Sequence, residues 1–283
     1  MEVCPVCSEN LWECWYQGAI RDGAFGSYSG PHSVYKCKAC SLGALQNDIG
    51  LSIDDYTSDH YRESLKQLSP DQASFSEQDD SLVHSIPIVD LPSLRGLTIV
   101  DVGCGVGSLL CSMTGLAKTV CGVEPSARYR EYLGDKGYEV FADINSLLQT
   151  EKLFDRVISL QVIEHVEDPL SFLTQCKQLL KKTKKSKIIV STPNWGDILF
   201  DLLGEEYASF WYRRAHRWYF NEFSLGALAK KAGLEVTSIR YTHKYGLSNF
   251  ILWARDKKPS GNADSGLVTK SIDDMWRNHL IDC

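Results

Sequence analysis

Between residues 97 and 192, short apolar runs alternate with amphipathic stretches, and this alternation limits the fold more than any other feature of the chain. The apolar runs predict five strands, at residues 97–102, 119–124, 138–142, 155–160 and 187–192. Helices are expected to begin near Gly107, Ser126, Ile144 and Asp168. Because strands that alternate with crossover helices form a parallel sheet with helices on both faces, the pattern predicts an α/β domain.

The alternation stops after residue 194. Residues 195–221 are dense in aromatic side chains and are interpreted as an insertion. A helix over 224–233 is expected to end at Gly233. Two strands, over 235–243 and 248–255, are expected to pair antiparallel at the sheet edge, which would make a mostly parallel sheet of seven strands. The predicted units are therefore residues 1–50, a helical lid or linker over 51–95, a main domain over 96–257 and a flexible tail over 258–283.

Composition argues against several classes of protein. The formal net charge is -6 over 283 residues, so broad binding to nucleic acid is not expected. The first residues lack a basic stretch followed by an apolar one, and no apolar run is long enough to span a bilayer. Neither a signal peptide nor membrane insertion is therefore expected. Cysteines scattered through apolar runs suit a reducing compartment, so we expect a cytoplasmic protein.

The sequence IVDVGCGVGS joins the first strand of this domain to its first helix. Asp101 closes the strand, and Gly103, Gly105 and Gly107 follow it. Glycines allow a tight turn and a close approach of the backbone to a ligand, and the next helix points its N-terminus at that ligand. The following strand ends in Glu124, whose carboxylate can accept hydrogen bonds from both hydroxyls of a ribose. The G-x-G-x-G spacing differs from the G-x-G-x-x-G of dinucleotide folds, which disfavours a nucleotide-binding dehydrogenase.

Four segments resemble class I S-adenosylmethionine-dependent methyltransferases over about residues 97–256: VDVGCGVGS, GVEPS, FDRVISLQVIEHVEDP, and HRWYF followed by SLGALAKKAGLEV. The resemblance implies a Rossmann-like methyltransferase fold and S-adenosylmethionine as the cofactor. It implies a set of cofactor-binding residues: Asp101, Gly103, Cys104, Gly105 and Gly107 at the methionine part, Glu124 with Pro125 at the ribose, Asp143 at the adenine and Gln161 beside the reacting sulfonium. Tyr61, in the predicted lid, either contacts the cofactor carboxylate or only packs.

Three side chains are candidates for removing a proton from an acceptor. Glu164 and His165 follow the fourth strand, at the edge where open α/β sheets bind ligands. His216 follows the fifth strand and could reach the same cleft, and a neutral imidazole suits a hydroxyl proton. His165 either orients the loop or acts on the substrate, and His216 is slightly favoured as the residue that faces the acceptor. A metal at Glu164 is not expected, because no further carboxylate stands at ligand spacing.

Two close cysteine pairs lie in the N-terminal segment. CPVC contributes Cys4 and Cys7, and CKAC contributes Cys37 and Cys40. Four thiolates in two such pairs satisfy tetrahedral Zn²⁺. Four protein ligands leave no open position, so we expect a structural zinc that folds a segment too small to build its own core. Residues 1–50 are therefore predicted to form a zinc ribbon.

The expected acceptor is a small molecule. An N-terminal four-cysteine segment joined to this core resembles bacterial sugar and surface-glycan methyltransferases, which favours a sugar, nucleotide sugar or glycan precursor. Trp211 and Tyr212 could stack on a sugar or base while Arg213 and Arg214 pair with phosphate, or the aromatic side chains could simply pack inward. The alternatives are a quinol or other aromatic O-methyltransferase, and a ribbon binding module with an inactive methyltransferase core. A homodimer is left open.

Overall fold

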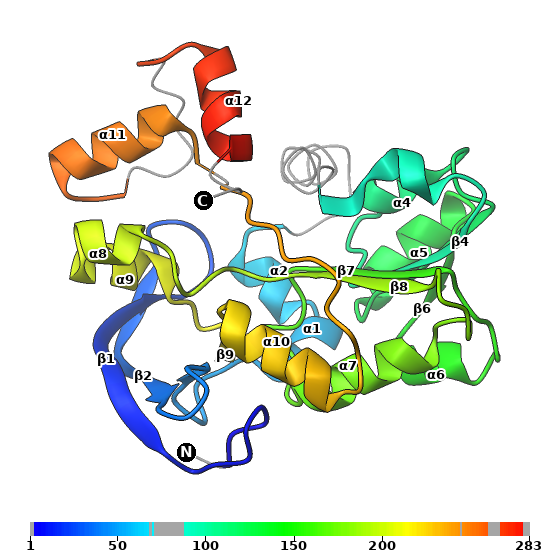
Figure 1. Ribbon diagram of the computed structural model, residues 1–283, viewed down its shortest axis with the longest axis horizontal. Coiled ribbons are helices and arrows are strands. Elements are labelled where there is room, and N and C mark those ends of the chain that lie inside the picture. The colour runs from blue at the N-terminus through cyan, green and yellow to red at the C-terminus, as the bar shows by residue number, and fades with distance from the viewer. Residues whose placement is uncertain (1–2, 68–69, 71–87, 244, 260–266, 280–283) are drawn as a thin grey trace.

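The computed structural model describes residues 3–67, 70, 88–243, 245–259 and 267–279. Its central feature is a parallel sheet with helices on both faces (Figure 1). The five strands are β4 (Thr98–Val102), β5 (Thr119–Val123), β6 (Glu139–Phe141), β7 (Arg156–Leu160) and β8 (Lys187–Ser191). They lie in the order β6, β5, β4, β7, β8, and all neighbours are parallel. The five predicted parallel strands are therefore confirmed.

Successive side chains of the central strand point to opposite faces of the sheet, and each face has its own core. Ile99 packs in a cluster with Leu110 and Leu133, whereas Val100 packs in a cluster with Leu147 and Phe172. The covering helices are α4 (Ser108–Met113), α5 (Ala127–Asp135), α6 (Ile144–Leu148) and α7 (Pro169–Gln178). Their starts agree with the sequence predictions. A strand buried on both faces explains why β4 is a nearly continuous apolar run.

The two predicted edge strands are wrong. Residues 235–243 form no strand in the structure, and residues 248–255 lie within a helix, α11 (Leu247–Asp256). The run Phe250 to Trp253 is apolar without interruption, so its period does not separate strand from helix. Helical geometry buries Asn249 and Trp253, which are four residues apart, on one face. Trp253 then packs against Tyr207, with ring centroids 6.2 Å apart.

A second, antiparallel sheet joins the N-terminal segment to the predicted insertion. Its strands are β1 (Trp12–Arg21), β2 (Tyr28–Cys37), β3 (Gly43–Leu45) and β9 (Trp218–Tyr219), in that order. Strands β1 and β2 form a long hairpin (dark blue in Figure 1), and β9 pairs with β3 through Gly43 and Ala44. The insertion thus completes a sheet begun in the first fifty residues.

The four-cysteine segment packs on the main domain. Cys4, Cys37 and Leu42 belong to the same buried cluster as strand residues of the parallel sheet. Lys231, in α10 (Glu222–Lys231), donates hydrogen bonds to the carbonyl of Pro5 and to the hydroxyl of Ser8, each at 2.8 Å. The buried side chains of this segment therefore share one hydrophobic core with the main domain.

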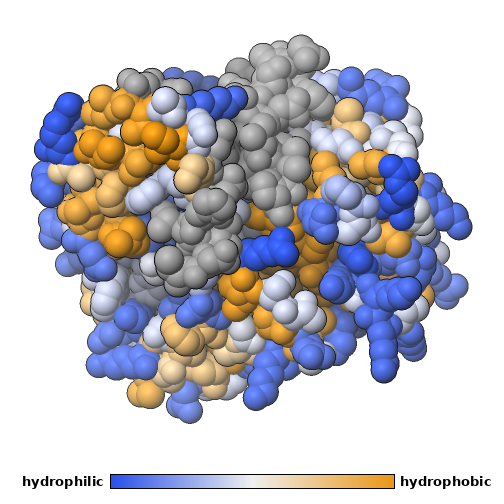
Figure 2. Space-filling view, turned by 45° about the horizontal axis from the view of Figure 1, so that its top comes forward, coloured by the Kyte–Doolittle hydropathy of each residue, from blue (hydrophilic) through white to orange (hydrophobic). Residues whose placement is uncertain are grey.

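The insertion itself contains two helices, α8 (Leu199–Leu203) and α9 (Glu205–Trp211). Two further helical segments are η1 (Leu91–Leu94), whose Leu94 packs in the cluster of Ile99, and α12 (Lys270–His279). The tail predicted to be flexible contains α12, and Asp273 of this helix accepts a hydrogen bond from the backbone N–H of Ser248. Apolar side chains gather on the side of α8 and α11 (upper left in Figure 2), where Ile198 and Ile251 are exposed. Within the described ranges, no helix is long and apolar enough to cross a membrane.

Candidate functional site

The glycine loop between β4 and α4 is shaped by close contacts that exclude side chains. Gly103 and Gly107 have φ angles of +84° and +82°, which favour glycine. A Cβ atom on Gly103 would lie 2.4 Å from a methyl group of Val162, and one on Gly107 would lie 2.5 Å from Leu133. Because Val162 belongs to the loop after β7, the glycine loop and the loop of the predicted acid–base residues touch each other.

Glu124 holds the glycine loop from the end of β5. Its carboxylate accepts hydrogen bonds from the backbone N–H groups of Gly105, at 2.9 Å, and Ser126, at 3.1 Å. The guanidinium of Arg62 lies 3.6 Å from the same carboxylate and stacks on the ring of Tyr129 at 4.5 Å. Glu124 is buried, so a cofactor ribose would reach this carboxylate only after Arg62 moves.

The other residues predicted to bind the cofactor differ in how far they are exposed to solvent. Asp101 is buried at the end of β4, and burial, with the charge of Glu124, raises its pKa to about 7. Cys104 is buried against Gly122, whereas Gln161 is exposed at the end of β7 and donates to Ser191 at 3.2 Å. Pro125 is half-buried, and its carbonyl accepts a hydrogen bond from Arg130. Asp143 caps the first turn of α6, which gives this residue a structural role of its own.

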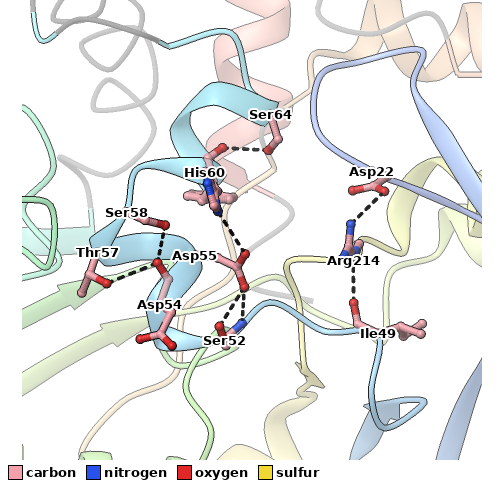
Figure 3. A network of polar contacts seen from close by, with 11 residues as sticks. Asp22, Ile49, Ser52, Asp54, Asp55, Thr57, Ser58, His60, Ser64 and Arg214 are labelled. Carbon is pink, nitrogen blue, oxygen red and sulfur yellow. Dashed lines mark hydrogen bonds and ion pairs between the residues drawn. The ribbon is translucent and has the colours of Figure 1, made fainter.

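Two short helices, α1 (Ile53–Thr57) and α2 (His60–Ser64), form a lid over this region. A local network fixes them: Asp55 accepts from the backbone N–H and hydroxyl of Ser52, and His60 lies 3.9 Å from Asp55 (Figure 3). From the lid, the ring of Tyr61 lies 4.8 Å from that of Tyr56 and 5.9 Å from that of His165. Tyr61 thus covers the predicted acid–base residues.

Glu164, His165 and His216 come together in one buried cluster. Nε2 of His165 lies 3.8 Å from the carboxylate of Glu164, and the rings of the two histidines are 4.9 Å apart and edge-on. The backbone carbonyl of Glu164 accepts from the N–H groups of Arg217 and Trp218, which brings the insertion to the loop after β7. His216 is about fifty residues from His165 in the sequence, and the turn before β9 brings the two side chains together.

The protonation of this cluster follows from its burial. Nδ1 of His165 lies 2.7 Å from the carbonyl oxygen of Ala215 and 3.0 Å from the hydroxyl of Tyr56. A carbonyl only accepts, so we assign the ring proton to Nδ1 and the lone pair to Nε2. Burial raises the pKa of Glu164 to about 8 and lowers the pKa of His165 to about 4. Burial, with His165 and the charge of Arg21, also holds the pKa of His216 well below its usual range.

Two groups of side chains have the spacing of metal ligands among the described residues. In each group the ligand atoms lie within 4.8 Å of one another: Cys4, Cys7, Cys37 and Cys40 form one, and Glu164, His165 and His216 form the other. The thiol pairs Cys4–Cys40 and Cys7–Cys37 are each 3.5 Å apart. Tetrahedral zinc with bonds of about 2.3 Å needs sulfur atoms about 3.8 Å apart, so the cysteines fit it closely.

The residues predicted to bind the acceptor are mostly engaged elsewhere. Tyr212 is 1% exposed and accepts a hydrogen bond from the indole of Trp195. Trp211 packs on the ring of Tyr219 at 5.3 Å. Of the two expected arrangements, the structure favours inward packing: Tyr212 is buried between the second sheet and α9, and Trp211 is half-buried beside it. Arg214 is exposed and bonded to Ile49 and Asp22 (Figure 3), so it braces the lid and hairpin.

Sequence reasoning missed two arginines. Arg62 follows Tyr61 directly, and nothing in its local pattern distinguishes it from a solvated charge on a short helix. Arg21 ends β1, far along the chain from the site, and its local sequence gives no sign of a role there. The structure brings both to the region of the glycine loop and the acid–base cluster.

Comparison with known proteins agrees with this geometry. The family described as a methyltransferase domain matches residues 57–239, well over half of the chain. The chain belongs to this family. The prediction of a methyltransferase is thereby confirmed at the level of the family, and the family match spans α2 of the lid, the parallel sheet and β9.

Curated relatives of this methyltransferase-domain chain are named as ubiquinone biosynthesis O-methyltransferases. One from Rhodopseudomonas palustris (strain TIE-1) is 33% identical over 161 residues, which are 54% of this chain and 64% of that protein. One from Dinoroseobacter shibae is 33% identical over 153 residues, which are 50% of this chain and 61% of that protein. The match thus spans less than two thirds of the relatives' length.

Two solved structures are similar. Magnesium protoporphyrin IX methyltransferase from Synechocystis, with bound S-adenosylhomocysteine, is 18% identical, with a TM-score of 0.49 over 68% of this chain and 92% of that chain. A methyltransferase from Archaeoglobus fulgidus, described as dependent on S-adenosylmethionine, is also 18% identical, with a TM-score of 0.48 over 73% of this chain and 90% of that chain.

Proposed function

We propose that the protein is an S-adenosylmethionine-dependent O-methyltransferase that acts on a hydroxyl group of a small molecule. The observation that carries the proposal is the contact between the glycine loop and the loop after β7. Gly103 packs against Val162, and Val162 stands two residues before Glu164. A cofactor on the glycine loop and a proton acceptor in the buried cluster would therefore share one cleft at the carboxyl edge of the sheet.

The residues at this edge fit the cofactor. Gly103, Gly105 and Gly107 carry no side chains that would separate a cofactor from the backbone, and Asp101 and Glu124 supply carboxylates at the ends of adjacent strands. Two backbone amides use only part of the accepting capacity of the Glu124 carboxylate, so ribose hydroxyls could donate to it once Arg62 has moved away. When bound, S-adenosylmethionine supplies a methyl group on a positively charged sulfur, and transfer to oxygen returns the bonding electron pair to that sulfur.

We assign proton removal to His165. Its ring is oriented by Ala215 and Tyr56 at Nδ1, which leaves the Nε2 lone pair free to accept the hydroxyl proton of the acceptor. Glu164 lies 3.8 Å from Nε2, and because its pKa is about 8 its carboxyl group is mostly neutral at pH 7, so it would act as a counter-ion to the imidazolium only above that pH. His216 lacks such orientation, since its Nδ1 has no hydrogen-bond partner in the described part of the chain. The lid above this cluster would exclude water from the reaction.

A phenolic or quinol acceptor is the better supported class. The curated relatives carry names of ubiquinone biosynthesis O-methyltransferases, and the burial of Tyr212 removes one ring of the platform expected for a sugar. A phenol also needs less help to lose its proton than a sugar hydroxyl does, which suits a buried imidazole of lowered basicity. Sugar derivatives are the second candidate and belong in the same assay.

We further propose that Cys4, Cys7, Cys37 and Cys40 hold a structural zinc ion. Four cysteines satisfy its coordination, so the site has no position open for a substrate. Its role would be to fix the start of the chain on α10 and β3, next to the strands that position His216.

The deciding experiment is a methyl-transfer assay with isotope-labelled S-adenosylmethionine and mass spectrometry of the products. The panel contains catechols, quinols, sugars and sugar phosphates. Label in a catechol or quinol would support a phenolic or quinol acceptor, and label in a sugar would support a sugar derivative as the acceptor. His165→Gln is expected to lower kcat by roughly a hundredfold or more without changing cofactor affinity. Cofactor binding with no transfer to any acceptor would support a binding module with an inactive core.

A further inference from the structure

Arg21 is a buried cation, and among the described residues no acidic side chain forms an ion pair with it. It is 8% exposed, and its Nε has no hydrogen-bond partner in the described ranges. Its guanidinium lies 5.2 Å from the ring centre of Phe210, a contact that supplies no hydrogen-bond acceptor to Nε. Burial lowers the pKa of Arg21, although arginine stays charged in proteins. A buried charge without a counter-ion is costly unless something else supplies one.

Arg21 faces a small pocket with about 20 Å³ of free space, room for one water-sized group, so a carboxylate or phosphate would enter only as the lining side chains move apart. A second arginine, Arg213, also lines the pocket, together with the polar side chains of Tyr61 and Ser64. Asp22 is the acid among the lining residues, and its carboxylate turns to Arg214 at 3.4 Å (Figure 3). The pocket is therefore positively charged, with N–H donors from two elements that are far apart in sequence.

The pocket adjoins the acid–base cluster. Tyr61 and Ala215 line the pocket, and both also contact His165, Tyr61 through its ring and Ala215 through its carbonyl oxygen. The charge of Arg21 also reaches His216 and contributes to the low pKa of that histidine. A group bound beside Arg21 would thus lie next to the place where the acceptor hydroxyl must be deprotonated.

We propose that Arg21 and Arg213 bind an anionic group of the acceptor, a carboxylate or a phosphate, and so determine which hydroxylated molecules are methylated. The proposal rests on the proposed function and narrows its substrate class to anionic acceptors. Arginine suits this task because its planar fork of donors matches the oxygens of both groups. Binding the anion would compensate the buried charge of Arg21 and hold the rest of the acceptor beside His165.

The test compares matched acceptors that differ only in the anion: catechol against its ring-carboxylated counterpart, and a sugar against its phosphate ester. For the unaltered protein, we expect KM for the charged member of the productive pair to be at least about tenfold lower, as charge-assisted hydrogen bonds predict. Equal KM values within the productive pair would overturn the proposal, and this comparison needs no variant.

Variants then locate the effect. Arg21→Met and Arg213→Met should raise KM for the charged acceptor about tenfold or more and leave KM for the neutral one unchanged. Arg95→Met is the control, because Arg95 is exposed and does not line the pocket, and it should change neither value. A loss of turnover with both acceptors in a folded Arg21→Met protein would show that the arginine is structural, and would contradict the assignment.

A binding measurement separates this inference from the proposed function. At a few millimolar, too dilute for general stabilisation by salt, inorganic phosphate should raise the melting temperature of the unaltered protein above that in chloride at equal ionic strength, and Arg21→Met should abolish the difference. If no acceptor is methylated, the proposed function fails, and this phosphate effect still decides the inference. Identical melting curves in phosphate and chloride, together with no methylation of charged acceptors, would reject the anion site.

Discussion

The guanidinium of Arg62 lies 3.6 Å from the carboxylate of Glu124. Arg62 comes from the lid, and Glu124 ends the strand next to the glycine loop. The pair therefore links closure of the lid to the residue expected to hold the cofactor ribose. In this state the lid cation and the ribose hydroxyls would compete for the same oxygen atoms, so binding of the cofactor requires the lid to rearrange.

Replacing Glu124 with alanine should weaken the binding of S-adenosylmethionine more than tenfold. Without the carboxylate, the ribose would lose its hydrogen bonds and the N–H group of Gly105 would lose its acceptor. The free energy of cofactor binding should fall by about 1.4 kcal/mol or more. Isothermal titration calorimetry measures the change. Affinity equal to that of the unaltered protein would remove the ribose assignment.

Replacing Arg62 with methionine should strengthen cofactor binding by about two- to fivefold, the range expected for a modest, partly exposed ion pair. The substitution removes the cation that competes with the ribose and keeps a side chain that can pack on Tyr129. The same calorimetry tests it, with Arg128→Met on the neighbouring helix as the control. Weaker binding would mean that Arg62 contacts the cofactor and does not merely compete with it.

The parallel sheet could be predicted because its cause is local. Five apolar runs and four helix starts lie in sequence order, and the Asp168–Pro169 start even shows its capping chemistry, with Asp168 accepting from the N–H groups of Leu170 and Ser171. The edge strands could not be predicted, since the run from Phe250 to Trp253 fits both periods. The packing of Trp253 against Tyr207 and Phe210, both in α9, favours a helix, and this contact is not visible in the local sequence.

The site divides in the same way. Glu124, Glu164 and His165 stand next to strand ends, so the sequence alone indicated their edge of the sheet. Their meeting with His216 and Arg21 depends on β9 completing the sheet of the N-terminal hairpin. The pairing of β3 with β9 joins Gly43 to Tyr219, which are far apart in the sequence. A strand of two residues such as β9 is also too short to show a periodic pattern. The burial of Tyr212 has the same origin.

Glu164 should make the protein less stable as pH rises. Its pKa is about 8 in the folded state and near 4.5 when unfolded, so the folded protein binds the extra proton between these values. His165 acts oppositely below pH 6.5, because its folded pKa is about 4. Between pH 6.5 and 8, urea unfolding of the Glu164→Gln variant should therefore lack a decline of up to about 1.4 kcal/mol per pH unit that the unaltered protein shows. If the unfolding free energies of the two proteins change with pH in the same way, the side chain of Glu164 is exposed to water and its pKa is not raised.

Replacing Cys37 with serine should lower the zinc content and the melting temperature together. The four thiols stand at the spacing of one tetrahedral ion, and Cys4 and Cys37 are also fully buried in the main core cluster. Loss of one ligand should thus loosen the N-terminal segment from α10 and β3. Atomic absorption and thermal melting give the two readouts, and Cys14→Ser is the control, because Cys14 is exposed and outside the group. Full zinc occupancy in Cys37→Ser would rule out the four-cysteine site, whereas equal loss in Cys14→Ser would assign the ion to other ligands.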